Sequence, residues 1–183
     1  MMLWRANRTI LLFSLLLMTA SSGHAQTDAS GYSVPAIGSK AMNIEGKDLQ
    51  GKEISLFSLK ENYLVLFLYE TSCHFCEAIF PEMKLNYPAW KENGLEVYSI
   101  PVNRDYEGWK LLSKEQNFPW INVIDTIHLD SLKSVYKISV SPTIFILDKS
   151  RNIVSSRLVR PDGINEWLEQ NLQIHLPNQN EQH

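Results

Sequence analysis

Two cysteines, Cys73 and Cys76, are the residues whose type and spacing most directly indicate chemistry in this chain. They are the only cysteines among its 183 residues, and two residues separate them. A disulfide between them would close almost no loop, so it would restrict the unfolded chain very little. A small secreted fold held together by disulfides needs more pairs at wider spacing. The pair therefore predicts thiol-disulfide exchange rather than a structural cross-link.

The sequence on either side of the pair predicts how the two thiols are positioned. Residues 63–69 form a continuous apolar run, which is typical of a strand buried on both faces. Residues 77–92 carry apolar side chains at helical spacing and contain Pro81, at which we expect a bend. A thiol at the start of such a helix meets unsatisfied N–H groups and the positive end of the dipole, which favour its thiolate. We therefore predict that Cys73 is the nucleophile and that Cys76, one turn later, resolves the mixed disulfide.

A cysteine pair can also hold a metal, attach a haem or simply fill a core. A zinc site needs four ligands, and the candidate histidines are scattered, with His175 and His183 near the end of the chain. A c-type haem needs a histidine directly after the second cysteine, where Glu77 stands. Two buried thiols without chemistry remain an alternative, because free cysteine is often a small core residue. We expect no metal and no cofactor.

The neighbours of the pair are candidates for tuning and substrate contact. A cationic His74 between the thiols would favour the thiolate and make the disulfide more oxidising, whereas an exposed His74 without effect is the alternative. Phe75 is expected to pack locally or to offer an apolar contact to a substrate. Glu70 and Glu77 are nearby carboxylates that are more often solvated charges. Of these two, Glu70 is a candidate for proton relay.

Beyond this region the chain alternates strand and helix patterns, which indicates an α/β sandwich with a mixed sheet. An N-terminal hairpin is expected from residues 42–44 and 53–56, with a turn between them. The other expected strands span residues 95–102, 121–124, 143–148 and 153–160, and the other expected helices span residues 108–116, 129–136 and 162–172.

The N-terminal segment predicts export. Arg5 and Arg8 precede an apolar run at residues 10–18, and small residues lead to Ala25. We predict a signal peptide over residues 1–25, a linker over 26–40, one α/β domain over 41–174 and a flexible tail over 175–183. An uncleaved N-terminal membrane anchor is the alternative to cleavage. Either way the domain is expected outside the cytoplasm, in the periplasm or otherwise exported, with no membrane span after signal cleavage.

The net charge of −3, with acidic and basic residues interspersed, does not suit a nucleic-acid partner. The partners expected instead are protein thiols and disulfides, together with an unidentified redox protein. We expect a monomer.

Several motifs in combination resemble one known family. They are residues 51–56 as the first strand, Ser72 to Cys76 after the central strand, Phe80-Pro81 in the helix, the inserted region 105–136, and Ser141-Pro142-Thr143 before a strand. The chain resembles the TlpA/ResA-like thioredoxin family of exported thiol-disulfide oxidoreductases, which is related to the AhpC/TSA redoxins. The resemblance covers nearly all of the chain after the predicted signal.

The resemblance implies a thioredoxin-like three-layer sandwich with a mixed central sheet, helices on both faces and an N-terminal β-hairpin. It also implies that Pro142 is in the cis form and faces the disulfide. Ser141 would then offer backbone groups to an extended substrate peptide, which would tolerate varied partners. A trans proline that only begins the strand is the alternative.

The chain departs from the family pattern at three positions. Ser72 stands where the family usually has Trp, and we expect it to cap the helix instead. Phe67 stands where thioredoxins are expected to have a buried acid, and Ile79 stands where ResA-like proteins are expected to have one. Catalysis without a buried carboxylate is therefore expected.

The function expected from these features is dithiol-disulfide exchange, with the reductase direction slightly favoured. A redox-inert adaptor with the same fold is one alternative. Thiol peroxidase activity is another, although the Pro-x-x-x-Thr-x-x-Cys pattern of peroxiredoxins precedes neither cysteine.

Overall fold

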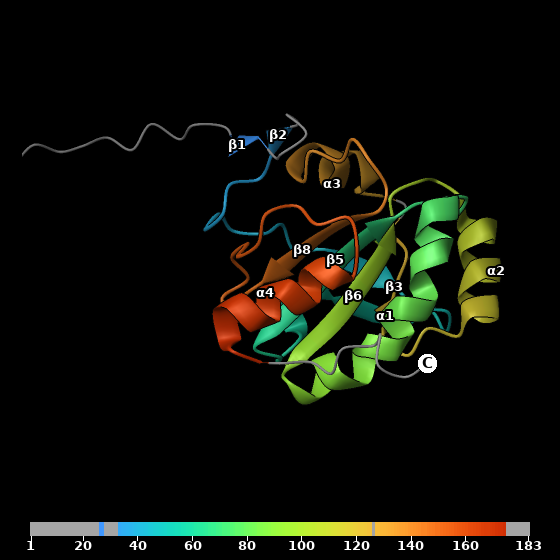
Figure 1. The fold of residues 1–183 in the computed structure, drawn as a ribbon. Coiled ribbons are helices and arrows are strands. Elements are labelled where there is room, and N and C mark those ends of the chain that lie inside the picture. Colours follow the sequence, from blue (N-terminus) through green and yellow to red (C-terminus); the bar gives the residue numbers. More distant parts are fainter. Residues whose placement is uncertain (1–25, 28–32, 126, 175–183) are drawn as a thin grey trace, which may run out of the picture.

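A central mixed sheet organises the computed structural model, which describes residues 26–27, 33–125 and 127–174. The strands are β5 (Tyr63–Tyr69), β6 (Leu95–Pro101), β7 (Ile121–Asn122) and β8 (Thr143–Leu147), in the order β7-β6-β5-β8. β6 runs parallel to both β5 and β7, whereas β8 runs antiparallel to β5. The predicted mixed sheet, parallel in its early half and antiparallel in its late half, is confirmed (Figure 1).

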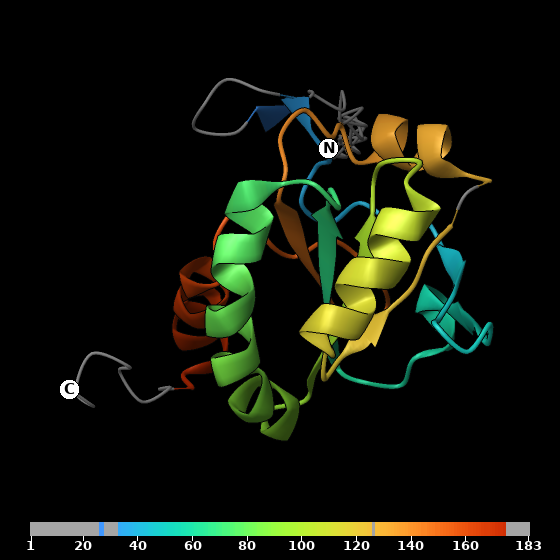
Figure 2. The same cartoon turned by 90° about the vertical axis from the view of Figure 1, so that its right-hand side faces the viewer.

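The sheet has a separate apolar core on each face. Along β5, Val65, Phe67 and Tyr69 join one core, and the alternate residues join the other, as the two-residue period of a strand requires. The first core is covered by α1 (His74–Glu92), α2 (Tyr106–Gln116) and α4 (Asp162–Leu172), and the second by α3 (Leu129–Val135) with the N-terminal hairpin. Figure 2 shows α1 and α4 on one side of the sheet and the hairpin on the other. The predicted three layers, with helices on both faces, are therefore present.

The N-terminal hairpin pairs β3 (Glu45–Lys47) with β4 (Glu53–Ser55), so its first strand begins later than residues 42–44. The shift has a structural cause at the sheet edge, where Lys47 pairs with Ile124 just beyond β7. Gly46 lies so close to Val123 that a Cβ there would approach its side chain to 2.5 Å. The backbone must therefore approach the edge at Gly46, and this contact sets the register of the hairpin.

The segment after β8 pairs with it only in part. Ile153 and Leu158 form isolated bridges to Leu147 and Ile144, so the continuous strand predicted over residues 153–160 is not present. Between these bridges the hydroxyl of Ser155 accepts a hydrogen bond from the Ile146 N–H at 2.8 Å. Between the two bridges this segment has more residues than β8 has, so it bulges away from the sheet.

Three further features complete the described chain. β1 (Gln26–Thr27) and β2 (Ser33–Val34) form a small antiparallel ladder within the predicted linker. A short 3-10 helix, Leu56–Ser58, precedes β5. Helix α1 continues through both of its internal prolines. The predicted signal peptide, residues 1–25, and the predicted tail, residues 175–183, lie outside the described residues.

Candidate active site

Cys73 lies at the junction between β5 and α1, where it is the N-cap of the helix. Its Sγ accepts a hydrogen bond from the backbone N–H of Cys76 at 3.2 Å, and its carbonyl accepts another from Glu77 N–H at 3.1 Å. The sulfur therefore occupies the position in which an N-cap side chain satisfies a free helical donor. The cap predicted at Ser72 is wrong, because Cys73 itself performs this role.

Cys76 lies one turn into the helix, with its side chain turned into the core. It is fully buried, whereas Cys73 is partly exposed, and both are free thiols. Burial raises the pKa of the Cys76 thiol to about 12, with a further rise from its contact with Cys73. The Ser141 hydroxyl acts in the opposite direction and lowers this pKa. At neutral pH, therefore, Cys73 presents an accessible sulfur, whereas Cys76 is a buried, protonated thiol.

The loop before β8 approaches both sulfurs. The peptide bond between Ser141 and Pro142 is cis, and Pro142 is buried. The carbonyl oxygen of Ser141 lies 3.6 Å from Cys73 Sγ, and its hydroxyl oxygen lies 3.5 Å from Cys76 Sγ. The Thr143 hydroxyl donates to the Val140 carbonyl at 2.8 Å, which closes the loop on itself. Ser141 thus contacts both thiols from the loop that faces the start of α1.

Thr71, in the loop that leads into Cys73, is held by a polar cluster that the sequence patterns did not predict. Its hydroxyl donates to Asp105 at 2.7 Å and accepts from the side-chain amide of Asn103 at 2.8 Å. Asp105 also caps α2 by accepting from Gly108 N–H at 2.9 Å. These hydrogen bonds lower the pKa of the Asp105 carboxyl, the Thr71 contact being the largest cause. An Asp just before a helical pattern is a recognisable cap signal, but its link to Thr71 depends on the tertiary fold.

An aromatic layer lies under the cysteines, and it includes Phe67, at which the resemblance implied an acid. Phe67 stacks on Tyr69 with ring centroids 5.4 Å apart and meets Phe80 edge-on at 6.1 Å. The Tyr69 hydroxyl is buried and donates to Asn122 Oδ1 at 2.9 Å. Burial raises the pKa of Tyr69, so this hydroxyl keeps its proton. The floor of the site is therefore aromatic, and its polar group near the cysteines is a neutral phenol.

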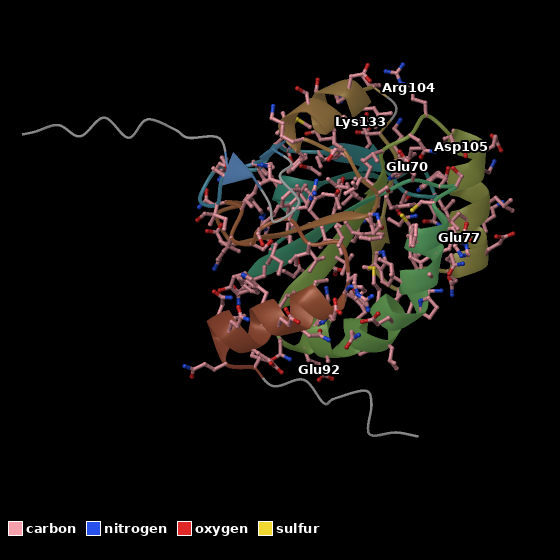
Figure 3. All side chains as sticks on the ribbon, turned by 45° about the horizontal axis from the view of Figure 1, so that its top comes forward. Glu70, Glu77, Glu92, Arg104, Asp105 and Lys133 are labelled. Carbon is pink, nitrogen blue, oxygen red and sulfur yellow. The ribbon has the colours of Figure 1, made fainter. Side chains whose placement is uncertain are left out.

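The other residues predicted around the pair lie on its rim. His74 and Phe75 are the first two residues of α1 and both are exposed, with Phe75 75% exposed. Glu70 is half-buried, and its carbonyl accepts from Cys73 N–H at 3.1 Å, while Glu77 is exposed. Figure 3 shows Glu70, Glu77 and Asp105 on the side of the site where α2 lies. Glu77 is in the first turn of α1 and Asp105 caps α2, so these carboxylates lie at the starts of the two helices.

An apolar groove of about 700 Å³ begins beside the cysteines, at Ser141. Ser141 and Pro142 form one end of it and so belong to both the groove and the thiol site. Its other lining residues come from α1, from the loop before β8 and from the segment after β8: Phe75, Ala78, Ile79, Glu82, Val140, Arg157, Val159 and Arg160. The groove is large enough for the side chains of an extended peptide.

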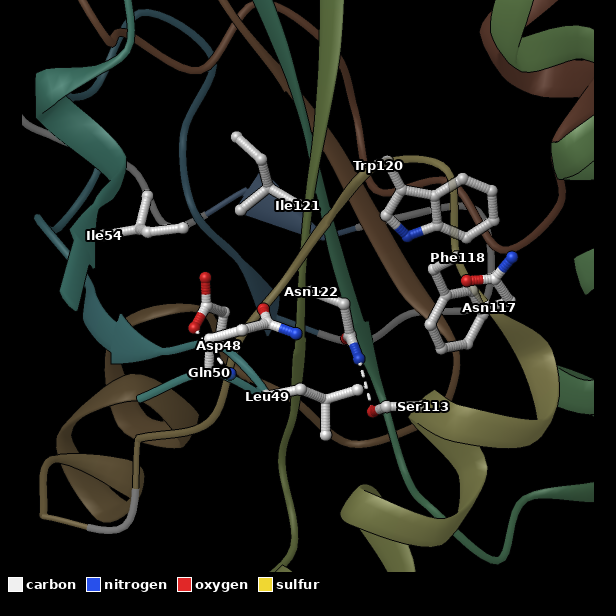
Figure 4. A pocket seen from close by; sticks show the side chains of 10 residues that line it. All are labelled: Asp48, Leu49, Gln50, Ile54, Ser113, Asn117, Phe118, Trp120, Ile121 and Asn122. Atoms are coloured by element: carbon white, nitrogen blue, oxygen red, sulfur yellow. Dashed lines mark hydrogen bonds between the residues drawn. The ribbon is translucent and has the colours of Figure 1, made fainter. Parts of the chain in front are cut away.

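A second cavity, of about 300 Å³, lies away from the thiols, between the hairpin turn and the end of α2 (Figure 4). Asn122 lines it and donates to Ser113 Oγ at 2.7 Å. Its walls contain neither a cysteine nor a histidine. Within the described residues, no group of three or more His, Cys, Asp or Glu side chains is placed to hold a metal ion.

Within the same described ranges, no helix has both the length and the apolar character needed to cross a bilayer.

Comparison with known proteins agrees with this geometry. The model of the AhpC/TSA family matches residues 37–156. The thiol-disulfide oxidoreductase ResA of Bacillus cereus is 30% identical over 118 residues, which are 64% of this chain and 67% of that protein. ResA of Bacillus subtilis is 28% identical over 144 residues, covering 76% and 78% of the two chains.

Solved structures show the same relationship. The thioredoxin domain of a thiol-disulfide oxidoreductase from Bacteroides vulgatus superposes with a TM-score of 0.67 at 28% identity, over 74% of this chain and 96% of that chain. A thiol:disulfide interchange protein from a Bacteroides species gives 0.68 at 26% identity, over 81% and 97% of the two chains. The chain belongs to the AhpC/TSA family and, within it, to the TlpA/ResA-like thioredoxin group of thiol-disulfide oxidoreductases.

Proposed function

We propose that this protein exchanges dithiols and disulfides with partner proteins outside the cytoplasm, with Cys73 as the attacking thiolate and Cys76 as the resolving thiol. One observation carries the proposal. The partly exposed Cys73 sulfur caps α1 and accepts the Cys76 N–H at 3.2 Å, while the Cys76 thiol is buried behind it. A hydrogen bond to the charged form favours that form, and burial disfavours it. The two thiols are thereby differentiated for attack and for resolution.

The reaction follows from this difference. The Cys73 thiolate attacks one sulfur of a partner disulfide, a mixed disulfide forms, and the other partner sulfur leaves as a thiolate that takes a proton from water. Cys76 then loses its proton and attacks the Cys73 sulfur, so the second partner sulfur leaves and is protonated in turn. The protein ends with a Cys73–Cys76 disulfide and the partner with two thiols. An electron-donating redox protein must then reduce the Cys73–Cys76 disulfide.

The residues around the sulfurs have separate roles in this scheme. Ser141 offers its backbone to an extended partner segment, in the manner of strand pairing, and Pro142 supports that loop. Phe75 provides an exposed apolar contact for the same segment. His74, next to the nucleophile at the helix start, favours its thiolate when the imidazole is cationic. Glu70, which is half-buried in the loop before Cys73, is the carboxylate proposed to accept the Cys76 proton.

The direction of electron flow is proposed as reduction of partners. Relatives of the ResA type support thiol-disulfide exchange, and the combination of motifs favours the reductase direction. Equilibration with glutathione redox buffers measures the potential of the pair. A potential well below that of glutathione supports the reductase direction, whereas a potential near that of strong protein oxidants contradicts it.

Export is proposed from the charged and apolar pattern of residues 1–25. Expression of the full chain with a C-terminal tag, followed by fractionation and N-terminal sequencing, tests it. A periplasmic or otherwise exported product that begins near Gln26 supports cleavage. A product that keeps residue 1 and stays with the membrane indicates an anchor, and a cytoplasmic product contradicts export.

Reduction of insulin disulfides by the full-length protein with dithiothreitol as electron donor tests the proposed activity. The wild type is expected to accelerate precipitation of the insulin B chain, and Cys73→Ser is expected to fall to the rate of dithiothreitol alone. Equal rates for wild type and Cys73→Ser would contradict the enzymatic proposal and favour a redox-inert binding module.

A further inference from the structure

The turn that leads into Cys73 is anchored at Thr71, two residues before the proposed nucleophile. Glu70 and Cys73 close this turn, because the Glu70 carbonyl accepts the Cys73 N–H at 3.1 Å. Inside it Thr71 is buried, with an exposure of 7%. Its N–H donates to Asn103 Oδ1 at 3.2 Å, while its hydroxyl donates to Asp105 and accepts from the Asn103 amide. Three hydrogen bonds therefore attach the turn to the segment between β6 and α2.

Asp105 reaches Thr71 because the residue three positions after Asp105 is a glycine. One carboxylate oxygen accepts the Gly108 N–H at 2.9 Å and caps α2, and the other accepts the Thr71 hydroxyl at 2.7 Å. A Cβ at Gly108 would come within 1.9 Å of the oxygen that receives the Thr71 hydroxyl. The missing side chain of Gly108 thus leaves room for a carboxylate that serves the helix and the cysteine turn together.

The sulfur of Cys73 has little freedom to move without losing its contacts. It lies 3.2 Å from the Cys76 N–H and 3.6 Å from the Ser141 carbonyl oxygen. Hydrogen bonds weaken steeply with misalignment, so both contacts depend on where the turn places Cys73. Ser72 is exposed, so Thr71 is the buried residue that holds the turn on this side.

We propose that Asn103 and Asp105 are positioning residues for thiol exchange, which act through Thr71 to hold the Cys73 sulfur against the Cys76 N–H. The inference rests on the proposed function, because it assigns two further residues to the same nucleophile. Their effect is to keep the sulfur where the start of α1 favours its thiolate. A small misplacement of a reacting atom slows a reaction even when the altered residue does not touch it.

The rate of the first exchange step tests this role. The reduced full-length protein is mixed with 2,2′-dithiodipyridine, a neutral disulfide. Attack by Cys73 breaks its S–S bond and forms a mixed disulfide, and the leaving sulfur takes a proton from water to give 2-thiopyridone, which is measured by absorbance. Attack by Cys76 on the mixed disulfide releases a second 2-thiopyridone, so the first phase belongs to Cys73 alone.

Asp105→Asn separates the cysteine turn from the cap of α2. Asn is as good an N-cap as Asp, so its side-chain oxygen can still accept the Gly108 N–H. Its NH₂ group then replaces the oxygen that accepts the Thr71 hydroxyl, and it cannot accept a hydrogen bond. The first phase should be about three- to tenfold slower than in the wild type at neutral pH. Loss of a negative charge would by itself favour a nearby thiolate, so a slower reaction identifies lost positioning.

Further variants disturb the same contacts by other routes. Gly108→Ala keeps Asp105 but displaces its carboxylate, and it should slow the first phase by a similar factor. Asn103→Ala removes two of the three hydrogen bonds at Thr71 and should slow it at least as much. Thr71→Ser, which keeps the hydroxyl, should recover most of the rate that Thr71→Val loses. Glu115→Gln makes the same carboxylate-to-amide change at an exposed position of α2 and should leave the rate unchanged.

A spectroscopic measurement separates positioning from stability. The chain has two cysteines, so protein labelled with ¹⁵N-cysteine gives two amide signals, and Cys76→Ser identifies the one from Cys76. The Cys73 amide reports its hydrogen bond to Glu70, and the Cys76 amide reports its hydrogen bond to Cys73 Sγ. Both signals should shift in Asp105→Asn and neither in Glu115→Gln, at a temperature where circular dichroism shows both variants folded.

The outcomes distinguish failure of this inference from failure of the proposed function. An unchanged or faster first phase in Asp105→Asn and Gly108→Ala would overturn the positioning role and leave thiol exchange intact. A slower first phase with unmoved amide signals would also overturn it, because the effect would not pass through the turn. Asp105→Asn carries the test if Asn103→Ala does not fold. No release of 2-thiopyridone by the wild type would overturn the proposed function itself.

Discussion

The hydroxyl oxygen of Ser141 lies 3.5 Å from the sulfur of Cys76, inside a site where that sulfur is fully buried. The same residue directs its carbonyl at Cys73. Burial raises the pKa of Cys76, and the Ser141 hydroxyl offsets part of that rise. A single polar side chain therefore influences how readily the Cys76 thiol ionises.

Replacing Ser141 with Ala should slow the resolving step. Loss of the hydroxyl raises the pKa of Cys76 further, and a hydrogen bond worth about 0.5–1.5 kcal/mol corresponds to roughly a 2- to 10-fold slower attack. Reaction with 5,5′-dithiobis-(2-nitrobenzoate) releases one chromophore on attack by Cys73 and a second on resolution, so the two rates are measured separately. The second phase should slow while the first is unchanged. Ser134→Ala, an exposed position on α3, is the control, and slowing of both phases alike would contradict the assignment.

The buried thiol should also leave a signature in alkaline stability. The pKa of Cys76 is raised in the folded protein from an ordinary 9.0 to about 12, so the folded state holds this proton more tightly than the unfolded state. Its contribution is fully present below pH 9 and is lost as the pH rises toward 12. Between pH 8 and 11 the reduced wild type should therefore lose roughly 1–3 kcal/mol more unfolding free energy than Cys76→Ala. Urea denaturation measures this, and parallel curves would contradict it.

The hydroxyl of Thr71 should support stability at neutral pH but not in acid. The pKa of Asp105 is lowered in the folded protein, so its contribution is present above the ordinary pKa of 3.8 and is lost as the pH falls through the lowered value. Thr71→Val removes the largest cause of that shift and should lower Tm at neutral pH by roughly 2–6 °C. The difference from wild type should narrow in acid. Thr71→Ser, which keeps the hydroxyl, should retain most of the wild-type Tm, and an equal loss in both variants would assign the effect to packing.

Phe80 should contribute more to stability than any exposed residue of the same helix. It meets Phe118 edge-on with ring centroids 4.9 Å apart and is fully buried under the cysteines. Phe80→Ala should reduce the unfolding free energy by about 3–5 kcal/mol. Leu85→Ala, on α1 but 60% exposed, should change it by less than about 0.5 kcal/mol. Similar losses at the two positions, measured by chemical denaturation, would contradict the assigned burial.

Local patterns predict much of the fold. The strand expected over residues 63–69 has the bounds of β5, and the final helix ends at Leu172 as expected, because long apolar periodicity decides such elements. The cap of this helix was expected at Asp162, but the structure has Pro161 there. The first strand of the hairpin begins later than residues 42–44, where it was predicted, because the contact of Gly46 with Val123, from a distant part of the sequence, fixes its position. The strand predicted over residues 153–160 is too long, because the Ser155 hydroxyl takes a backbone hydrogen bond that periodicity does not reveal.

The sequence predicts which residues make up the candidate site better than it predicts the contacts between them. The spacing of Cys73 and Cys76 directly predicts that the two thiols form a pair. The family resemblance predicts the cis peptide bond between Ser141 and Pro142. Cys73 caps the helix in place of Ser72, because a cysteine sulfur accepts a backbone hydrogen bond as a serine hydroxyl does. The link between Thr71 and Asp105 joins two loops and has no local signature.

Trapping of the mixed disulfide tests the division of roles between Cys73 and Cys76 most directly. Full-length Cys76→Ser and Cys73→Ser are each reduced, separated from the reductant and mixed with a peptide disulfide, and the products are weighed by intact mass spectrometry. Cys76→Ser should accumulate a stable covalent adduct at Cys73, while Cys73→Ser should form little or none and the wild type should pass on to its internal disulfide. An adduct that forms equally well on Cys73→Ser, or one that is absent from Cys76→Ser, would contradict the assignment of Cys73 as the attacking thiol.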